Sequence, residues 1–135
     1  MRITRLLLVA TAGLLAAVVV SCGDSAGDQT LETVSPTAAS EVLATNPDAI
    51  LLDIRTPEEY ASERIAGAEN IDFYAPDFSD QLASLDPDET YVVYCRSGNR
   101  TDSAMDVFDD LGFAVVYEVE GGIVGWVGAG LPILE

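Results

Sequence analysis

Apolar, strand-forming runs alternate with helical segments along this sequence, and this alternation constrains the fold more than any other feature. The strongest runs are Ala49–Ile54, Tyr91–Tyr94 and Ala114–Val119. The first is apolar until a charge near its end, which is typical of a strand covered on both faces. Strands that alternate with helices at spacings of roughly twenty residues indicate βαβ units. We therefore predict an α/β fold built on a mainly parallel sheet.

Two predicted helices begin with the same signal, a hydroxyl residue followed by proline. Ser35-Pro36 opens the segment Thr37–Thr45, and Thr56-Pro57 opens a short helix. The hydroxyl caps free backbone N–H groups, and proline suits the first helical position because an N–H there has no partner. The remaining predicted elements are strands at Glu32–Ser35 and within Ile65–Ile71, and helices at Phe78–Leu85, Arg100–Leu111 and Gly121–Trp126.

The first 22 residues have the layout of an export signal. Met1–Arg5 is short and basic, Leu6–Val20 is mostly apolar, and Ser21 precedes Cys22. Charged, apolar and small-residue regions in this order mark a secretory signal. The end of this segment resembles a bacterial lipobox, which implies cleavage before Cys22 and a lipid on its sulfur. Acyl chains on that sulfur would hold the protein at a membrane surface.

We therefore predict a signal peptide at 1–21, a flexible tether at 22–31 and a folded domain at 32–135, anchored to the membrane outside the cytoplasm. An uncleaved anchor helix and a soluble secreted form remain as alternatives, and both also place the domain outside the cytoplasm.

The composition excludes several classes of function. The chain has 23 acidic and 6 basic residues, a net charge of −17, and it contains no histidine. Nucleic-acid binding requires a basic face, which this chain lacks. Without histidine there is no Cys–His or Ser–His pair, and two cysteines are too few for the usual four-ligand zinc site. We expect neither a metal nor another cofactor.

A single cysteine follows the strand Tyr91–Tyr94 and begins a short loop that contains two of the chain's few arginines. The loop, Cys95–Arg100, ends where a helical pattern begins. A thiol in this position faces free N–H groups at the positive end of a helix, and these stabilise a thiolate or a bound anion. Gly98 permits the positive φ that turns successive N–H groups inward. The sequence therefore indicates cysteine chemistry on a small anion.

Asp53 and Arg55 lie just beyond the carboxyl end of Ala49–Leu52, the position that Cys95 takes relative to the strand Tyr91–Tyr94. The carboxyl ends of parallel strands meet at one edge of a sheet, so we expect these residues near Cys95. We predict that Asp53 braces the loop by accepting its N–H groups. We predict that Arg55 makes a structural ion pair with Glu58, Glu59 or another acid.

Four segments, in the correct order, resemble the rhodanese family of sulfurtransferases. They are Leu51–Tyr60, Ile65–Ile71, Tyr94–Arg100 and Glu120–Ile133. The resemblance covers the chain from about Glu32 onward, and it implies a five-stranded sheet with helices on both faces. The second segment departs from the family pattern, with Arg64 in place of histidine and Ala66 in place of proline, which bears on substrate access.

The resemblance implies a two-step transfer of sulfur. The Cys95 thiolate attacks the outer sulfur of a donor such as thiosulfate, sulfite leaves, and the resulting persulfide passes its sulfur to cyanide, a thiol or a protein cysteine. Arg96 and Arg100 would orient the anionic donor. The backbone N–H groups that would hold the sulfur belong to Ser97, Gly98, Asn99 and Thr101.

Two other functions remain as alternatives. Phosphatases on the same fold separate the cysteine and the arginine by five residues, whereas four residues separate Cys95 from Arg100. The smaller loop suits one sulfur atom better than a tetrahedral oxyanion, which also disfavours arsenate reduction. A non-enzymatic sulfur-binding or redox-partner module is the second alternative. With Cys22 lipidated, no second cysteine can resolve a disulfide at Cys95.

Overall fold

The structure is a computed structural model that describes residues 27–135. Five strands form one sheet in the order β1-β5-β4-β2-β3, and every neighbouring pair is parallel. The strands are β1 (Thr30–Val34), β2 (Ile50–Asp53), β3 (Glu69–Asn70), β4 (Thr90–Tyr94) and β5 (Val115–Val119). The predicted α/β fold with a five-stranded parallel sheet is therefore confirmed.

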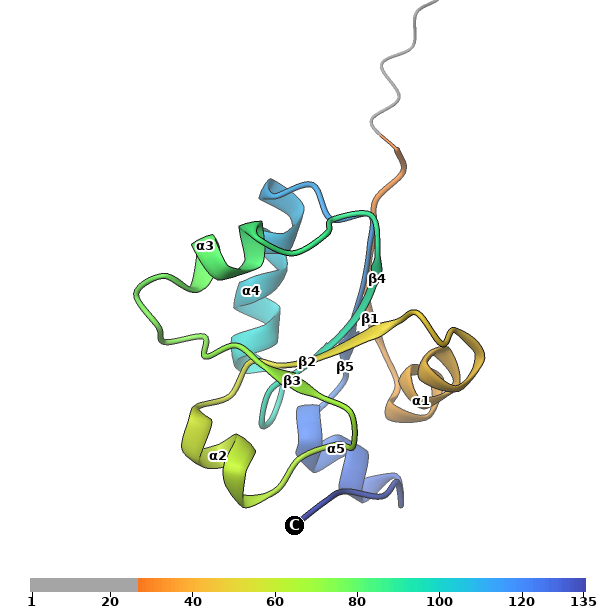
Figure 1. Cartoon of the computed structure of the whole chain (residues 1–135). Coiled ribbons are helices and arrows are strands. Elements are labelled where there is room, and N and C mark those ends of the chain that lie inside the picture. The colour runs from red at the N-terminus through yellow and green to blue at the C-terminus, as the bar shows by residue number, and fades with distance from the viewer. Residues whose placement is uncertain (1–26) are drawn as a thin grey trace, which may run out of the picture.

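Five helices, four between successive strands and α5 after β5, lie on both faces of the sheet (Figure 1). They are α1 (Pro36–Thr45), α2 (Pro57–Ser62), α3 (Phe78–Ala83), α4 (Asn99–Asp110) and α5 (Gly122–Gly128). Both predicted proline starts are present. The Ser35 hydroxyl accepts from the Ala38 N–H, and Thr56 and Glu59 cap each other reciprocally.

The central strand β4 is buried on both faces because its side chains alternate between two hydrophobic clusters. Tyr91 and Val93 join the cluster under α3 and α4, whereas Val92 and Tyr94 join the cluster under α1 and α5. Alternation of this kind follows from the two-residue period of a strand. Cys95 continues the first set, so its side chain enters the α3 and α4 side of the core.

The carboxyl ends of β2 and β4 meet, as the sequence predicts. Asp53 lies opposite Tyr94 in the register of these two strands. Just beyond it, the Ile54 N–H donates to the Tyr94 carbonyl at 3.0 Å. The two loops that follow these strands therefore leave the sheet side by side, which positions the candidate site.

The folded domain begins two residues earlier than predicted. Thr30 and Leu31, assigned from the sequence to the tether 22–31, belong to β1 and pair with Val115 and Val116 of β5. Their local pattern is too short to mark a strand, so pairing with β5 decides the boundary. The predicted signal segment 1–21 and Cys22 lie outside the described residues. Within residues 27–135, no helix combines the length and the apolar character needed to cross a bilayer.

Candidate active site

Cys95 lies directly after β4, at the entrance to the loop that precedes α4. Its side chain is buried, and the Gly98 N–H donates a hydrogen bond to its Sγ at 3.1 Å. Gly98 has a φ of 105° and is the N-cap of α4. This left-handed conformation, which strongly favours glycine, turns the loop back so that an amide reaches the sulfur. The loop therefore places a thiol at the beginning of a helix.

Burial and hydrogen bonding act on this thiol in opposite directions. Burial, the largest single influence, raises the pKa of Cys95 because a charge is poorly solvated in the core. The N–H and hydroxyl of Thr101, and the N–H groups of Gly98 and Arg100, favour the thiolate. Together these donors outweigh burial, so the pKa of Cys95 lies below its ordinary value. The site favours an ionised sulfur.

The other loop residues divide into those that contact the sulfur and those that face solvent. Thr101 is fully buried in the first turn of α4, with its Oγ1 at 3.7 Å from the Cys95 Sγ. Ser97 and Asn99 are exposed, and within residues 27–135 the N–H group that makes a hydrogen bond to the Cys95 Sγ is that of Gly98. Arg96 is also exposed and takes part in no ion pair within residues 27–135.

The start of α5 holds the backbone of the loop in place. The Ile123 N–H donates to the Cys95 carbonyl at 2.9 Å, and the Val124 N–H donates to the Arg96 carbonyl at 3.1 Å. A Cβ at Gly122 would lie 2.4 Å from the Cys95 carbonyl oxygen, a distance that real Cβ atoms do not reach. Gly122 is therefore a site residue that the sequence analysis did not identify, although the Gly121-Gly122 pair was a signal for it.

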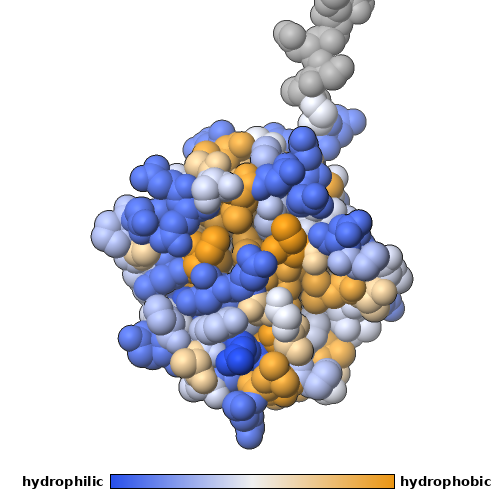
Figure 2. Space-filling model, in the orientation of Figure 1, coloured by the Kyte–Doolittle hydropathy of each residue, from blue (hydrophilic) through white to orange (hydrophobic). Residues whose placement is uncertain are grey.

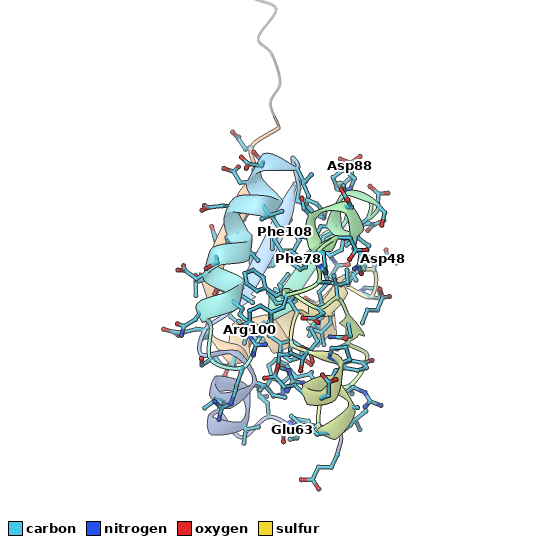
Figure 3. All side chains as sticks on the ribbon, turned by 90° about the vertical axis from the view of Figure 1, so that its left-hand side faces the viewer. Asp48, Glu63, Phe78, Asp88, Arg100 and Phe108 are labelled. Atoms are coloured by element: carbon cyan, nitrogen blue, oxygen red, sulfur yellow. The ribbon has the colours of Figure 1, made fainter. Side chains whose placement is uncertain are left out.

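Arg100 pairs with a carboxylate of the protein itself. Its guanidinium makes a two-pronged ion pair with Glu59 of α2, at 2.8 and 2.9 Å. Figure 3 shows Arg100 between the start of α4 and α2. The hydrogen bond from Arg100 is the main reason that the pKa of Glu59 falls to about 2. Arg100 therefore joins the loop to α2. Its predicted role in orienting a donor stays a prediction.

Asp53 and Arg55 form a buried pair beside the loop. The Arg55 guanidinium donates to Asp53 Oδ2 at 2.6 Å and also to the Glu63 carbonyl at 2.6 Å, and the Arg55 N–H donates to Asp53 Oδ1 at 2.9 Å. Arg55 therefore makes a structural ion pair, with Asp53 as its acid. The prediction that Asp53 accepts N–H groups of the Cys95 loop is wrong: within residues 27–135 no hydrogen bond runs from that loop to its carboxylate, which accepts from Arg55 instead.

Glu118 is a second functional candidate that the sequence analysis missed. It lies in β5, is only 5% exposed, and its carboxylate accepts hydrogen bonds from the hydroxyls of Thr101 and Thr33. A charged residue inside the apolar run Ala114–Val119 was the signal that could have revealed it. Through Thr101, this carboxylate is one hydroxyl away from the Cys95 sulfur.

The fold and this site define a class of protein in which an amide-lined loop between a strand and a helix holds a buried, ionisable thiol. Residues 35–129 match the family described as the rhodanese-like domain. That match covers more than half of the chain, and the chain belongs to the rhodanese-like family.

Relatives and solved structures agree with this assignment. A sulfurtransferase of Allochromatium vinosum is 35% identical over 95 residues, which cover 70% of this chain and 87% of the relative. Thiosulfate sulfurtransferase GlpE of Glaesserella parasuis is 32% identical over 106 residues, which cover 78% of this chain and 95% of the relative. A rhodanese-related protein from Thermoplasma volcanium has a TM-score of 0.64 at 28% identity, covering 76% of this chain and 97% of its own.

Proposed function

We propose that this protein is a sulfurtransferase that moves a sulfane sulfur from thiosulfate or a similar donor to a thiophilic acceptor. The carrier is a persulfide on Cys95. The observation that supports this most directly is the hydrogen bond from the Gly98 N–H to the Cys95 Sγ, within a loop that lowers the pKa of the thiol. The names of relatives such as the GlpE protein support thiosulfate as the donor.

The proposed reaction has two balanced steps. The Cys95 thiolate attacks the outer sulfur of thiosulfate, the sulfur–sulfur bond of the donor breaks, and sulfite leaves with the bonding electron pair. An acceptor thiol or cyanide then attacks the outer sulfur of the persulfide, and the Cys95 thiolate is regenerated. The N–H groups that stabilise the thiolate also suit the anionic persulfide. Arg96 is the exposed cation that meets an incoming anion at this loop.

The first prediction tests the carrier. After incubation of the whole protein with thiosulfate, intact mass spectrometry should show a gain of one sulfur atom that a reductant removes. Cys95→Ser should abolish this gain and the transfer of sulfur to cyanide, whereas Cys22→Ser should retain both. A gain that survives in Cys95→Ser refutes the assignment of the nucleophile. A gain without transfer favours a sulfur-binding module, and cleavage of an aryl phosphate without any gain favours a phosphatase.

We also propose that the mature protein is a bacterial lipoprotein outside the cytoplasm, with lipid on the Cys22 sulfur. The order of basic, apolar and small residues before Cys22 supports this. The second prediction is that the membrane-extracted protein begins at Cys22 and carries a lipid adduct in its intact mass. An unmodified chain that begins at Met1 would contradict both cleavage and lipidation.

A further inference from the structure

The Glu118 carboxylate and the Cys95 sulfur are both possible acceptors for the hydrogen bond of the Thr101 hydroxyl. The Thr101 hydroxyl has a single proton to donate and three acceptors around it. They are the Glu118 carboxylate, the Gly98 carbonyl at 2.9 Å and the Cys95 Sγ at 3.7 Å. A carboxylate is the strongest of these acceptors, and its contact with Thr101 is also the shortest. While that proton points toward Glu118, the hydroxyl stabilises the sulfur only weakly, across 3.7 Å.

The surroundings of Glu118 favour a lasting hydrogen bond from the Thr101 hydroxyl. Its second carboxylate oxygen accepts from the Thr33 hydroxyl of β1 at 3.0 Å, which fixes the orientation of the group. Both Glu118 and Thr101 are buried, so water does not replace either contact easily. Glu118 is thus a buried carboxylate with two hydroxyl donors, one of which also faces the Cys95 sulfur.

We propose that Glu118 is a positioning residue that, by accepting the hydrogen bond of the Thr101 hydroxyl, draws its proton away from the Cys95 sulfur. In this arrangement Glu118 keeps the thiol less ionised than the loop would make it alone. The inference rests on the proposed function only for the role of Cys95 as nucleophile. The hydrogen bond from the Gly98 N–H is unaffected, so the site keeps part of its stabilisation of the thiolate.

The other charged groups near this network provide a matched control. Asp102, Asp106 and Asp109 of α4 line the same groove as Glu118, a cavity of about 400 Å³, and the N-terminal segment contributes Gln29, Leu31 and Thr33, which carry no charge. Opposite Glu118 in β4 is the apolar Val93. Arg100 is the cation whose charge acts on the Cys95 sulfur. Asp106→Asn removes one carboxylate from the groove without touching Thr101.

The experiment measures the pH dependence of Cys95 alkylation by iodoacetamide, which needs no sulfur transfer. Glu118→Met removes both the charge and the acceptor, whereas Glu118→Gln removes the charge and keeps an acceptor oxygen. We expect Glu118→Met to lower the apparent pKa of Cys95 by about one unit. We expect a smaller decrease for Glu118→Gln and almost none for Asp106→Asn.

A second set of variants, made in a Thr101→Val background, distinguishes the effect of the Thr101 hydroxyl on the pKa of Cys95 from the effect of the carboxylate charge. In the Thr101→Val background, neither Glu118 variant should shift the pKa of Cys95 from that of Thr101→Val alone, because no hydroxyl remains to be redirected. Equal shifts with and without the hydroxyl would show a field effect and overturn the proposal, as would the absence of any shift. If Glu118→Met does not fold, Glu118→Gln in the two backgrounds makes the same comparison. These outcomes do not depend on whether the protein uses thiosulfate.

Discussion

Single residues determine whether the sulfur of Cys95 is reactive. The thiol is buried to 1% exposure, and burial alone would keep it protonated. The donors that reverse this effect are three backbone N–H groups and one hydroxyl, all within the six residues that follow Cys95. Amides are fixed donors, so they stabilise a thiolate or a persulfide without reorganising at the moment of reaction. The chain thereby obtains an ionisable cysteine without histidine.

The third prediction concerns the ion pair between Glu59 and Arg100. The pKa of Glu59 is lowered from 4.5 to about 2 in the folded protein, so the pair contributes its full stability above pH 4.5 and loses it as the pH falls toward 2. Glu59→Gln retains an oxygen for the cap at Thr56. It should lower the free energy of unfolding by about 1 kcal/mol at pH 7, and by much less near pH 3.

Urea denaturation of the two proteins from pH 7 to pH 3 provides the measurement. Glu58→Gln is the control, since Glu58 is an exposed neighbour in the same turn of α2. A difference between wild type and Glu59→Gln that stays constant across this range would mean that the pair contributes nothing that depends on charge.

Among the secondary-structure elements, the approach of α5 to the end of β4 matters most for the site. Two N–H groups from the first turn of α5 satisfy the carbonyls of Cys95 and Arg96, which otherwise lack partners where β4 ends. Gly122 makes this approach possible because it has no Cβ and adopts a φ of 57°. Hydrogen bonds from α5 to the loop backbone, and from the Gly98 N–H to the Cys95 sulfur, thus fix the conformation of the loop.

The fourth prediction is that Gly122→Ala destabilises the protein by about 3 kcal/mol, because the new Cβ overlaps the loop backbone and cannot be relieved by a rotamer change. The variant should also slow alkylation of Cys95, since the loop must move. Gly128→Ala is the control: a Cβ at Gly128 would meet no atom within 4 Å, so this variant should be neutral or slightly stabilising. Equal denaturation midpoints for the two variants in urea would contradict the close approach.

Negative charge is the dominant property of the protein as a whole. The net charge is −17, and only four arginines lie beyond residue 5. Hydrophilic residues cover much of the surface in Figure 2, while hydrophobic residues gather toward its centre and its lower end. Two of the most exposed hydrophobic side chains, Val124 and Val127, belong to α5. The net negative charge of the protein therefore repels a small anionic donor, although Arg96 and the N–H groups of the Cys95 loop attract it at the site itself.

The fifth prediction follows from that field. Iodoacetate and iodoacetamide alkylate a thiolate by the same chemistry, but only iodoacetate carries a charge. The ratio of the iodoacetate rate to the iodoacetamide rate at Cys95 should rise several-fold between about 0.01 and 0.3 M NaCl, because salt screens the repulsion of the anion. The rate with iodoacetamide alone should change little. A ratio that falls with salt would show that Arg96 and the amide-lined loop outweigh the net charge.

Features that depend on local pattern could be predicted from the sequence. The apolar runs and the proline-containing helix starts located the elements because strand burial and helix capping act within a few residues. The left-handed turn at Gly98 and the thiol at the end of β4 were predictable for the same reason. The start of β1 was misplaced because its strand pattern is weak, and its pairing with β5 is a contact across about 85 residues.

The partner of each polar side chain, in contrast, became clear only in the folded protein. Arg100 pairs with Glu59, 41 residues away. Asp53 pairs with Arg55, and Glu118 of β5 reaches Thr101 of α4. Such pairings depend on distances between elements and on the cost of leaving a buried charge without a partner. Neither quantity can be read from the spacing of residues along the chain.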